Sequence, residues 1–268
     1  MNAASRAFFS VLLGWGSLAH SAPPDRLQTL PLTVDGVART ALVYVPADPS
    51  PGPLPLVFVF HGHGGSSRQV ERTFQIDRLW PGAISVYPQG LDTAGQLLDP
   101  GGNLPGWQPR PGTEGDRDLH FFDALLARLK RDEPVDPARV YCTGHSNGGG
   151  FTYVVWRARG DVFAAVAPCS AAAGFAAQLP PKAAMICGGL NDPIVKFAWQ
   201  QRTMDAVRRV NGCDATGTPW EGVGVQYASQ TGTPLVTYTY PGGHPMDRAE
   251  PGLIVKFFQG HPGPTTRP

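Results

Sequence analysis

The chain has 268 residues, and its 22 Lys and Arg against 21 Asp and Glu give a formal net charge of +1. This balance gives no reason to expect a nucleic acid or an anionic membrane as a partner. Hydrophobic residues make up 42% of the chain, which is enough for a sizeable core, and the length suits one large domain or two small ones.

The first residues have the pattern of a secretory signal peptide. Arg6 supplies a positive charge, residues 7–18 (AFFSVLLGWGSL) form an apolar run too short to span a bilayer comfortably, and the small residues Ala19 and Ser21 follow. The pattern predicts a signal peptide over residues 1–21, cleaved after Ser21. An ordinary N-terminal helix is the alternative. We therefore expect a secreted protein, periplasmic or extracellular, with residues 22–268 as one domain.

The next segments read as strands. Residues 27–47 form two candidate strands joined by Asp35-Gly36, a strong hairpin turn. The run LPLVFVF at residues 54–60 is apolar throughout, as expected for a strand buried on both faces of a parallel sheet. A further short strand, AISVYPQ, follows, and residues 90–115 are rich in Gly and Pro and read as a loop.

From residue 118 onward, helices and strands alternate. Residues 118–131 place Leu and Phe on one face and charges on the other, which predicts a helix. The strand ARVYCTG, a helix from Asn147, the strands AAVAPCS and AAMICGG, a helix over 198–210, the strand LVTYTYP and a helix near 253–258 follow. The order predicts an α/β fold: a mostly parallel sheet with an N-terminal antiparallel hairpin and helices on both faces. Chemistry in such sheets lies at the carboxyl ends of the strands.

A serine sits at one of these strand ends. The segment GHSNG at residues 144–148 matches the G-x-S-x-G pattern, in which glycines let the backbone pass closely around an exposed serine. The pattern alone is weak, but here it lies between a predicted strand and a predicted helix, the context that it requires. Ser146 is therefore a candidate nucleophile; a Gly-rich turn without function is the alternative.

A serine nucleophile needs a base and an acid, which in this arrangement follow it in the order acid, then histidine. His244 lies on the loop after the last predicted strand, whereas the other histidines precede Ser146 or lie in the tail. Asp192 follows the strand AAMICGG, where its carboxylate could orient the imidazole, although Asp before Pro193 also suits a turn. We expect Ser146, His244 and Asp192 to act together.

The segment HGHGG at residues 61–65 follows the early buried strand, where this architecture supplies an oxyanion hole. We assign its two donors to the backbone N–H groups of His63 and Asn147. The alternative, a zinc site at His61 and His63, lacks a third ligand at a suitable spacing, so we expect no metal.

The four cysteines contain no CxxC pair. Cys142, Cys169 and Cys187 fall in apolar strand-like runs, where buried free thiols are an alternative to disulfides. Cys213 follows a helix and is the best candidate for a surface disulfide. The sequence does not choose among the pairings.

With these residues placed, the chain resembles the α/β-hydrolase superfamily, and within it the secreted serine esterases that are polyhydroxybutyrate depolymerase-like or feruloyl esterase-like. The resemblance runs from about residue 30 to 258 and is carried by VFVFHGHGG, DPARVYCTGHSNGGG, NDPIVKF, VNGC and PGGH. It differs from many relatives at His63, where they have a cysteine, and at Pro245-Met246, where they have a nearby Trp. The cysteine that often partners the VNGC motif is also missing.

The resemblance implies Ser146, Asp192 and His244 as a triad that hydrolyses carboxylic esters through an acyl-enzyme, without a cofactor. We expect a soluble feruloyl, acetyl or short hydroxyalkanoate ester as substrate. Trp107 either lines the substrate pocket or caps the core. A serine peptidase, an acyltransferase and a non-catalytic binding protein on the same fold are the alternatives.

Overall fold

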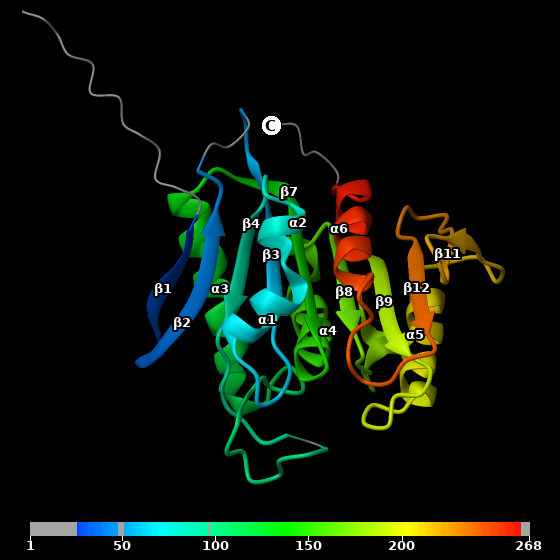
Figure 1. The fold of residues 1–268 in the computed structure, drawn as a ribbon, viewed down its shortest axis with the longest axis horizontal. Helices are drawn as coiled ribbons and strands as arrows, with labels where there is room; N and C mark the ends of the chain where they lie inside the picture. The colour runs from blue at the N-terminus through cyan, green and yellow to red at the C-terminus, as the bar shows by residue number, and fades with distance from the viewer. Residues whose placement is uncertain (1–25, 48–50, 96, 264–268) are drawn as a thin grey trace, which may run out of the picture.

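The computed structural model describes residues 26–47, 51–95 and 97–263, so the predicted signal peptide lies outside the described residues. One large sheet has the strand order β1-β2-β4-β3-β7-β8-β9-β12-β11-β10 (Figure 1). Its strands are β1 Arg26–Val34, β2 Val37–Val45, β3 Leu54–Phe60, β4 Ile84–Pro88, β7 Val135–His145, β8 Ala165–Cys169, β9 Ala183–Gly189, β10 Thr218–Trp220, β11 Gly224–Tyr227 and β12 Leu235–Tyr240. Two short strands, β5 Leu91–Asp92 and β6 Pro105–Gly106, pair with each other in the loop that follows β4.

The centre of the sheet is parallel and both of its ends are antiparallel. Strands β4, β3, β7, β8, β9 and β12 run parallel to one another, whereas β2 pairs with β4 in the antiparallel sense. The predicted N-terminal hairpin is present: β1 and β2 pair through the two-residue turn Asp35-Gly36, and both turn residues have positive φ. The antiparallel addition of β11 and β10 beyond β12 was not anticipated from the sequence.

Helices cover both faces of the sheet, as the alternation predicted. The helices are α1 Ser67–Phe74, α2 Ile76–Leu79, α3 Arg117–Asp132, α4 Asn147–Arg159, α5 Phe197–Val210 and α6 Glu250–Gly260. Helices α3, α4 and α5 pack into one hydrophobic core, and α1, α2 and α6 into a second. Figure 1 shows the latter three in front of the sheet. No helix within the described ranges is long and apolar enough to cross a membrane.

All four cysteines are free thiols. Cys142, Cys169 and Cys187 lie on β7, β8 and β9 and are fully buried, which matches the buried-thiol alternative. The expectation of a surface disulfide at Cys213 is wrong for this structure. Its sulfur packs beside the carbonyl oxygen of Thr233, at 3.7 Å, and burial raises the pKa of the thiol.

Candidate active site

Ser146 occupies the sharp turn between β7 and α4. Its backbone has φ 58° and ψ −121°, a conformation that L-residues rarely adopt, and such strain persists only where the surroundings enforce it. The Ser146 N–H donates to the carbonyl of Cys169 on the neighbouring strand at 3.0 Å. The turn therefore holds the serine at the carboxyl end of the central strands, as the G-x-S-x-G pattern predicted.

Two glycines make this turn possible. A Cβ on Gly148 would lie 2.2 Å from the carbonyl oxygen of Phe60, and a Cβ on Gly144 would lie 2.5 Å from that of Gly148. Both distances are far below van der Waals contact with backbone atoms that cannot move aside. The first turn of α4 therefore packs directly on the end of β3, and this close approach fixes where Ser146 sits.

His244 links the serine to a carboxylate. Its Nε2 lies 2.8 Å from Ser146 Oγ, and its Nδ1 lies 2.8 Å from Asp192 Oδ2. The imidazole is 14% exposed and the Asp192 side chain is fully buried. The three residues come from the ends of β7, β9 and β12, so parallel strands bring together positions that are up to 98 residues apart in sequence.

The Asp192 carboxylate has a full set of hydrogen bonds. Oδ1 accepts from the backbone N–H groups of Ile194 and Val195 at 2.8 and 3.0 Å. Oδ2 accepts from the Gln200 side chain at 3.0 Å as well as from His244. Gln200 lies on α5 and is fully buried. Sequence reasoning missed it, since nothing in the helical pattern distinguishes it from its exposed neighbour Gln201.

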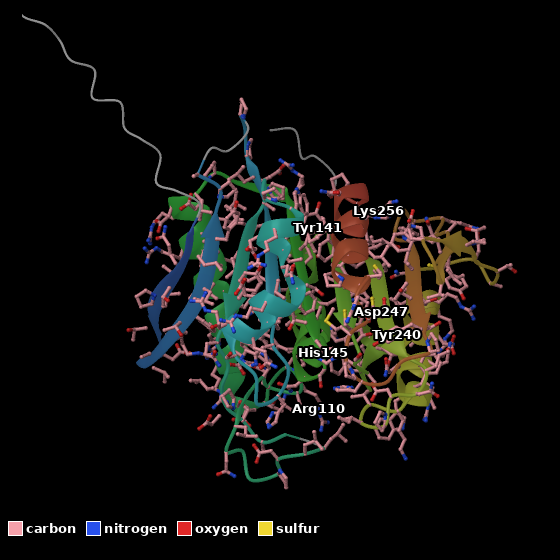
Figure 2. All side chains as sticks on the ribbon, in the orientation of Figure 1. Arg110, Tyr141, His145, Tyr240, Asp247 and Lys256 are labelled. Carbon is pink, nitrogen blue, oxygen red and sulfur yellow. The ribbon has the colours of Figure 1, made fainter. Side chains whose placement is uncertain are left out.

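His145, immediately before Ser146, is a second residue that sequence reasoning missed. Burial lowers its pKa to about 4, so the ring is neutral at ordinary pH. Its Nε2 lies 2.7 Å from the carbonyl oxygen of His244, which can only accept, so Nε2 carries the proton and donates. Figure 2 labels His145 at the end of the central strands. The contact ties the His244 backbone to the turn that carries Ser146.

The HGHGG loop after β3 faces the same turn. His61 is buried, and burial lowers its pKa to about 4. Its Nδ1 donates to Gly62 O at 2.7 Å, and its Nε2 accepts from the N–H of Gly90 at 2.9 Å. Both nitrogens are thus engaged in holding the loop. A Cβ built on Gly62 would lie 3.5 Å from the Cβ of Ser146, which places the loop directly beside the serine.

The two predicted oxyanion-hole donors are the backbone N–H groups of His63, on the HGHGG loop, and of Asn147, at the start of α4. Asn147 is the first residue of α4, so its N–H has no acceptor within the helix. Within the described part of the chain, the His63 N–H donates to no backbone carbonyl, whereas those of Gly64 and Gly65 do. Side chains fix both residues: Asn147 Oδ1 accepts from the Trp107 N–H at 2.8 Å, and His63 Nε2 lies 3.1 Å from Asp99 Oδ2.

Trp107 does not line the cavity beside Ser146. Its side chain is 1% exposed, stacks on Phe151 with ring centroids 5.0 Å apart, and contacts Phe60 edge-on at 5.4 Å. Its indole N–H donates to His61 O at 2.9 Å. The pocket role proposed from sequence is therefore replaced by the core-capping alternative: Trp107 supports the HGHGG loop from beneath.

The described residues form one group whose side chains could jointly ligate a metal, made of Cys169, Cys187 and Glu250. It contains neither His61 nor His63. The nitrogen atoms of His61 are taken by backbone partners, which argues against the zinc alternative at the HGHGG loop.

A cavity of about 1240 Å³ opens beside Ser146. Its apolar wall comes from the alanine-rich segment 171–177, Ile194, Val195 and Trp199. His63, Ser146 and Asn147 lie in its lining, so the proposed nucleophile and donors face one space. A space of this size suits a ligand larger than an acetyl group.

The strained serine at the strand–helix turn, and the order serine, aspartate, histidine at the ends of β7, β9 and β12, decide the architecture. The chain has the α/β-hydrolase fold. An acetyl xylan esterase from Aspergillus awamori shares this fold, with a TM-score of 0.63 over 87% of this chain and 99% of that one, at 14% identity. No protein-family model matches the sequence.

In sequence, this α/β-hydrolase-fold chain is similar to feruloyl esterases. It is 30% identical over 172 residues to "Probable feruloyl esterase C" of Aspergillus oryzae, which covers 60% of this chain and 62% of that protein. It is 31% identical over 169 residues to "Feruloyl esterase C" of Emericella nidulans, a match that covers 60% of this chain and 57% of that protein. The chain thus spans about three fifths of the length of these relatives.

Proposed function

We propose that the protein is a serine carboxylic-ester hydrolase. The observation that carries this proposal is the continuous hydrogen-bonded chain from Ser146 Oγ through both nitrogens of His244 to Asp192, with 2.8 Å at each step. The similarity to feruloyl esterases supports an ester as the substrate.

In the proposed mechanism, Ser146 Oγ attacks the ester carbonyl while His244 Nε2 takes its proton. The buried Asp192 carboxylate accepts the Nδ1–H of His244 and stabilises the imidazolium that forms. The N–H groups of His63 and Asn147 donate to the oxyanion of the tetrahedral intermediate. His244 then protonates the leaving alkoxide, and a water molecule activated by the same imidazole hydrolyses the acyl-enzyme.

The proposal extends to substrate and location. The similarity to feruloyl esterases and the size of the cavity favour feruloyl esters, with acetyl and short hydroxyalkanoate esters as the other classes. Residues 1–21 are proposed as a cleaved signal peptide and residues 22–268 as one catalytic domain, which makes the enzyme periplasmic or extracellular.

The test is hydrolysis of p-nitrophenyl esters from acetate upward, methyl ferulate and hydroxybutyrate oligomers by wild type and Ser146→Ala. We expect activity that disappears in Ser146→Ala. A folded wild type without activity on any ester would support the non-catalytic binding protein. Amide substrates cleaved at rates comparable with esters would support the peptidase, and transfer of the acyl group to an added alcohol in preference to water would support the acyltransferase.

A further inference from the structure

The charge on the wall of the large cavity differs from the charge of the chain as a whole. Acidic and basic side chains nearly balance over the full sequence, 21 against 22. The charged residues in the described lining of the cavity are Arg110, Arg157 and Arg202, and no Asp or Glu is among them. This surface beside the proposed nucleophile is therefore cationic.

The three arginines come from separate elements and converge on the cavity. Arg110 lies on the loop after β6, Arg157 in the last turn of α4, and Arg202 on α5. Figure 2 labels Arg110 below His145, toward the loops at the strand ends. None of the three forms an ion pair with a described residue, and Arg202 Nε donates only to Ala198 O in its own helix.

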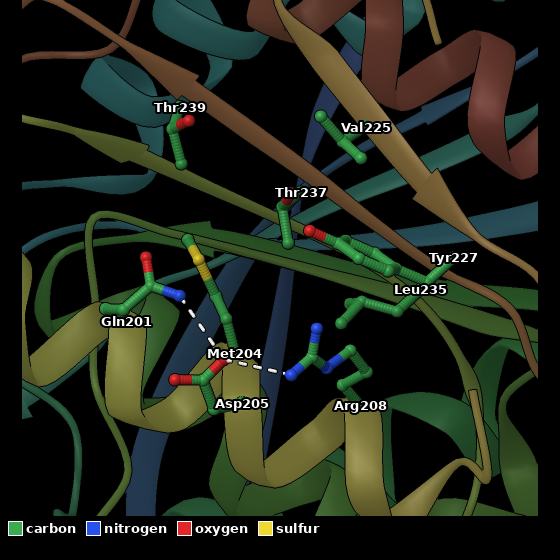
Figure 3. Close-up of a pocket in the computed structure, with 9 residues that line it drawn as sticks. All are labelled: Gln201, Met204, Asp205, Arg208, Val225, Tyr227, Leu235, Thr237 and Thr239. Atoms are coloured by element: carbon green, nitrogen blue, oxygen red, sulfur yellow. Dashed lines mark hydrogen bonds and ion pairs between the residues drawn. The ribbon is translucent and has the colours of Figure 1, made fainter. Parts of the chain in front are cut away.

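Another cavity provides a contrast. This space, of about 140 Å³, lies between α5 and the strands β11 and β12 (Figure 3). Its one arginine, Arg208, lies 3.9 Å from Asp205, and Asp205 also accepts from Gln201 at 3.3 Å. The positive charge of Arg208 is thus compensated inside that pocket by the Asp205 carboxylate. In the large cavity the guanidinium groups have no such partner on the described wall.

The distance between Arg157 and the serine limits the ligand. Asn147 begins α4 and Arg157 follows ten residues later, so at ~1.5 Å per residue the helix carries the cavity wall ~15 Å from the nucleophile. The alanine-rich segment 171–177, with Phe175, provides an apolar surface along the same cavity. The space therefore suits a ligand with an apolar middle and an anionic end.

We propose that the enzyme prefers esters that carry a carboxylate remote from the scissile bond, and that Arg110, Arg157 and Arg202 bind this group. The inference rests on the proposed ester hydrolysis at Ser146. A planar guanidinium matches a carboxylate with two parallel hydrogen bonds and stays charged at any pH at which the enzyme works. The apolar surface of the same cavity binds the chain that separates the two ends of the ligand.

The experiment compares pairs of substrates that differ in one charge. Mono-p-nitrophenyl esters of dicarboxylic acids with four to twelve carbons are compared with the same compounds methylated at the far carboxyl. A second series places the carboxylate on the alcohol half, as acetyl esters of ω-hydroxy acids and their methyl esters. The measured quantity is the ratio of kcat/KM for the charged substrate to that for its uncharged partner.

We expect the ratio to exceed one in at least one series, to rise with chain length, and to fall as salt is added. Arg157→Gln and Arg202→Gln should each lower it by about threefold to fivefold, as for exposed charge pairs, because kcat/KM falls more for the charged ester than for its uncharged partner. Arg72→Gln is the matched control, because Arg72 is an exposed helical arginine outside the cavity.

Hydrolysis of both members of every pair with equal kcat/KM, or a preference that the cavity arginines and Arg72 affect alike, would overturn the inference while leaving ester hydrolysis intact. Failure of the wild type to hydrolyse any member would instead contradict the proposed function.

Discussion

The ring of His145 donates from Nε2 to the backbone carbonyl of His244 at 2.7 Å, and the two ring centroids lie 4.9 Å apart. The residue before the proposed nucleophile thus holds the loop of the proposed base. The contact spans 99 positions in sequence and joins the ends of β7 and β12. It gives His145 a positioning role, since its hydrogen bond goes to the His244 backbone and not to Ser146 Oγ or to a ring nitrogen of His244.

His145→Phe should therefore impair the chemical step more than substrate binding. Without the hydrogen bond the His244 loop is free to shift, and a displacement of ~1 Å at a proton-transfer group lowers the rate by about 100-fold. We expect kcat to fall by that order and KM to change little.

His145→Gln is the matched control for this change, because its amide can still donate to the His244 carbonyl, and it should retain much of kcat. Burial already lowers the pKa of His145 to about 4, so neither variant should move the pH profile near neutrality. Equal losses in both variants would contradict the positioning role.

Gln200→Leu should lower kcat/KM by about tenfold or more, because a hydrogen bond to a charged group contributes about 1.5–3 kcal/mol. The change removes the amide that donates to Asp192 Oδ2 and leaves the carboxylate buried with one partner fewer. Steady-state kinetics on a p-nitrophenyl ester would measure the loss.

Gln201→Leu is the control on the same helix, since Gln201 is exposed and bonds only Asp205. If both variants kept wild-type kinetics, Gln200 would have no part in orienting Asp192.

Gly148→Ala should destabilise the fold by about 3 kcal/mol or more, as expected for overpacking against a backbone that cannot yield. The new Cβ would lie 2.2 Å from Phe60 O. Gly150→Ala, two residues along the same helix, meets no atom within 4 Å and should stabilise by about 0.5–1 kcal/mol. Urea unfolding of the two variants measures both effects, and changes of the same sign would contradict the close approach of α4 and β3.

Glu250 should give stability a specific pH dependence. The side chain is fully buried at the start of α6, Oε1 accepts from the Asp247 N–H at 2.8 Å, and burial raises the pKa of the carboxyl to about 7. The folded state then keeps a proton that the unfolded state releases above its ordinary pKa of 4.5. The stabilising contribution is complete below pH 4.5 and is lost as pH rises toward 7, by up to about 3 kcal/mol.

Glu250→Gln remains neutral and should remove this loss. The free energy of unfolding, measured in urea from pH 4 to pH 8, should fall more steeply with pH in wild type than in the variant. Parallel curves would show that Glu250 does not titrate in this range.

Much of the architecture could be predicted from the sequence, because in these segments the pattern of apolar residues matches the burial of the element that forms. The run LPLVFVF is apolar throughout and became β3, buried at every position; residues 118–131 carried a clear apolar face and became α3. The edge strands β10 and β11 were missed because three and four residues hold too little pattern, and their pairing depends on β12.

Some residues of the candidate site could likewise be predicted from the sequence, and others could not. Ser146, Asp192 and His244 stand at strand ends, where topology alone brings them together. Gln200, Arg157 and Arg202 lie on helices and Arg110 lies on a loop, and no local sequence pattern reveals how far these residues are from Ser146. Trp107 was a candidate pocket residue that turned out to be buried. An aromatic side chain in a Gly/Pro loop can face either the cavity or the core, and only its stacking on Phe151 decides between them.

The central claim is that Ser146 becomes acylated. The most direct measurement is rapid mixing with p-nitrophenyl acetate followed by acid quenching and mass spectrometry of the intact protein and its peptides. The account predicts a burst of nitrophenol, one acetyl group per chain on the peptide that contains Ser146, and neither signal in Ser146→Ala. An acetyl group on another residue, or hydrolysis by a folded Ser146→Ala protein at the wild-type rate, would contradict it.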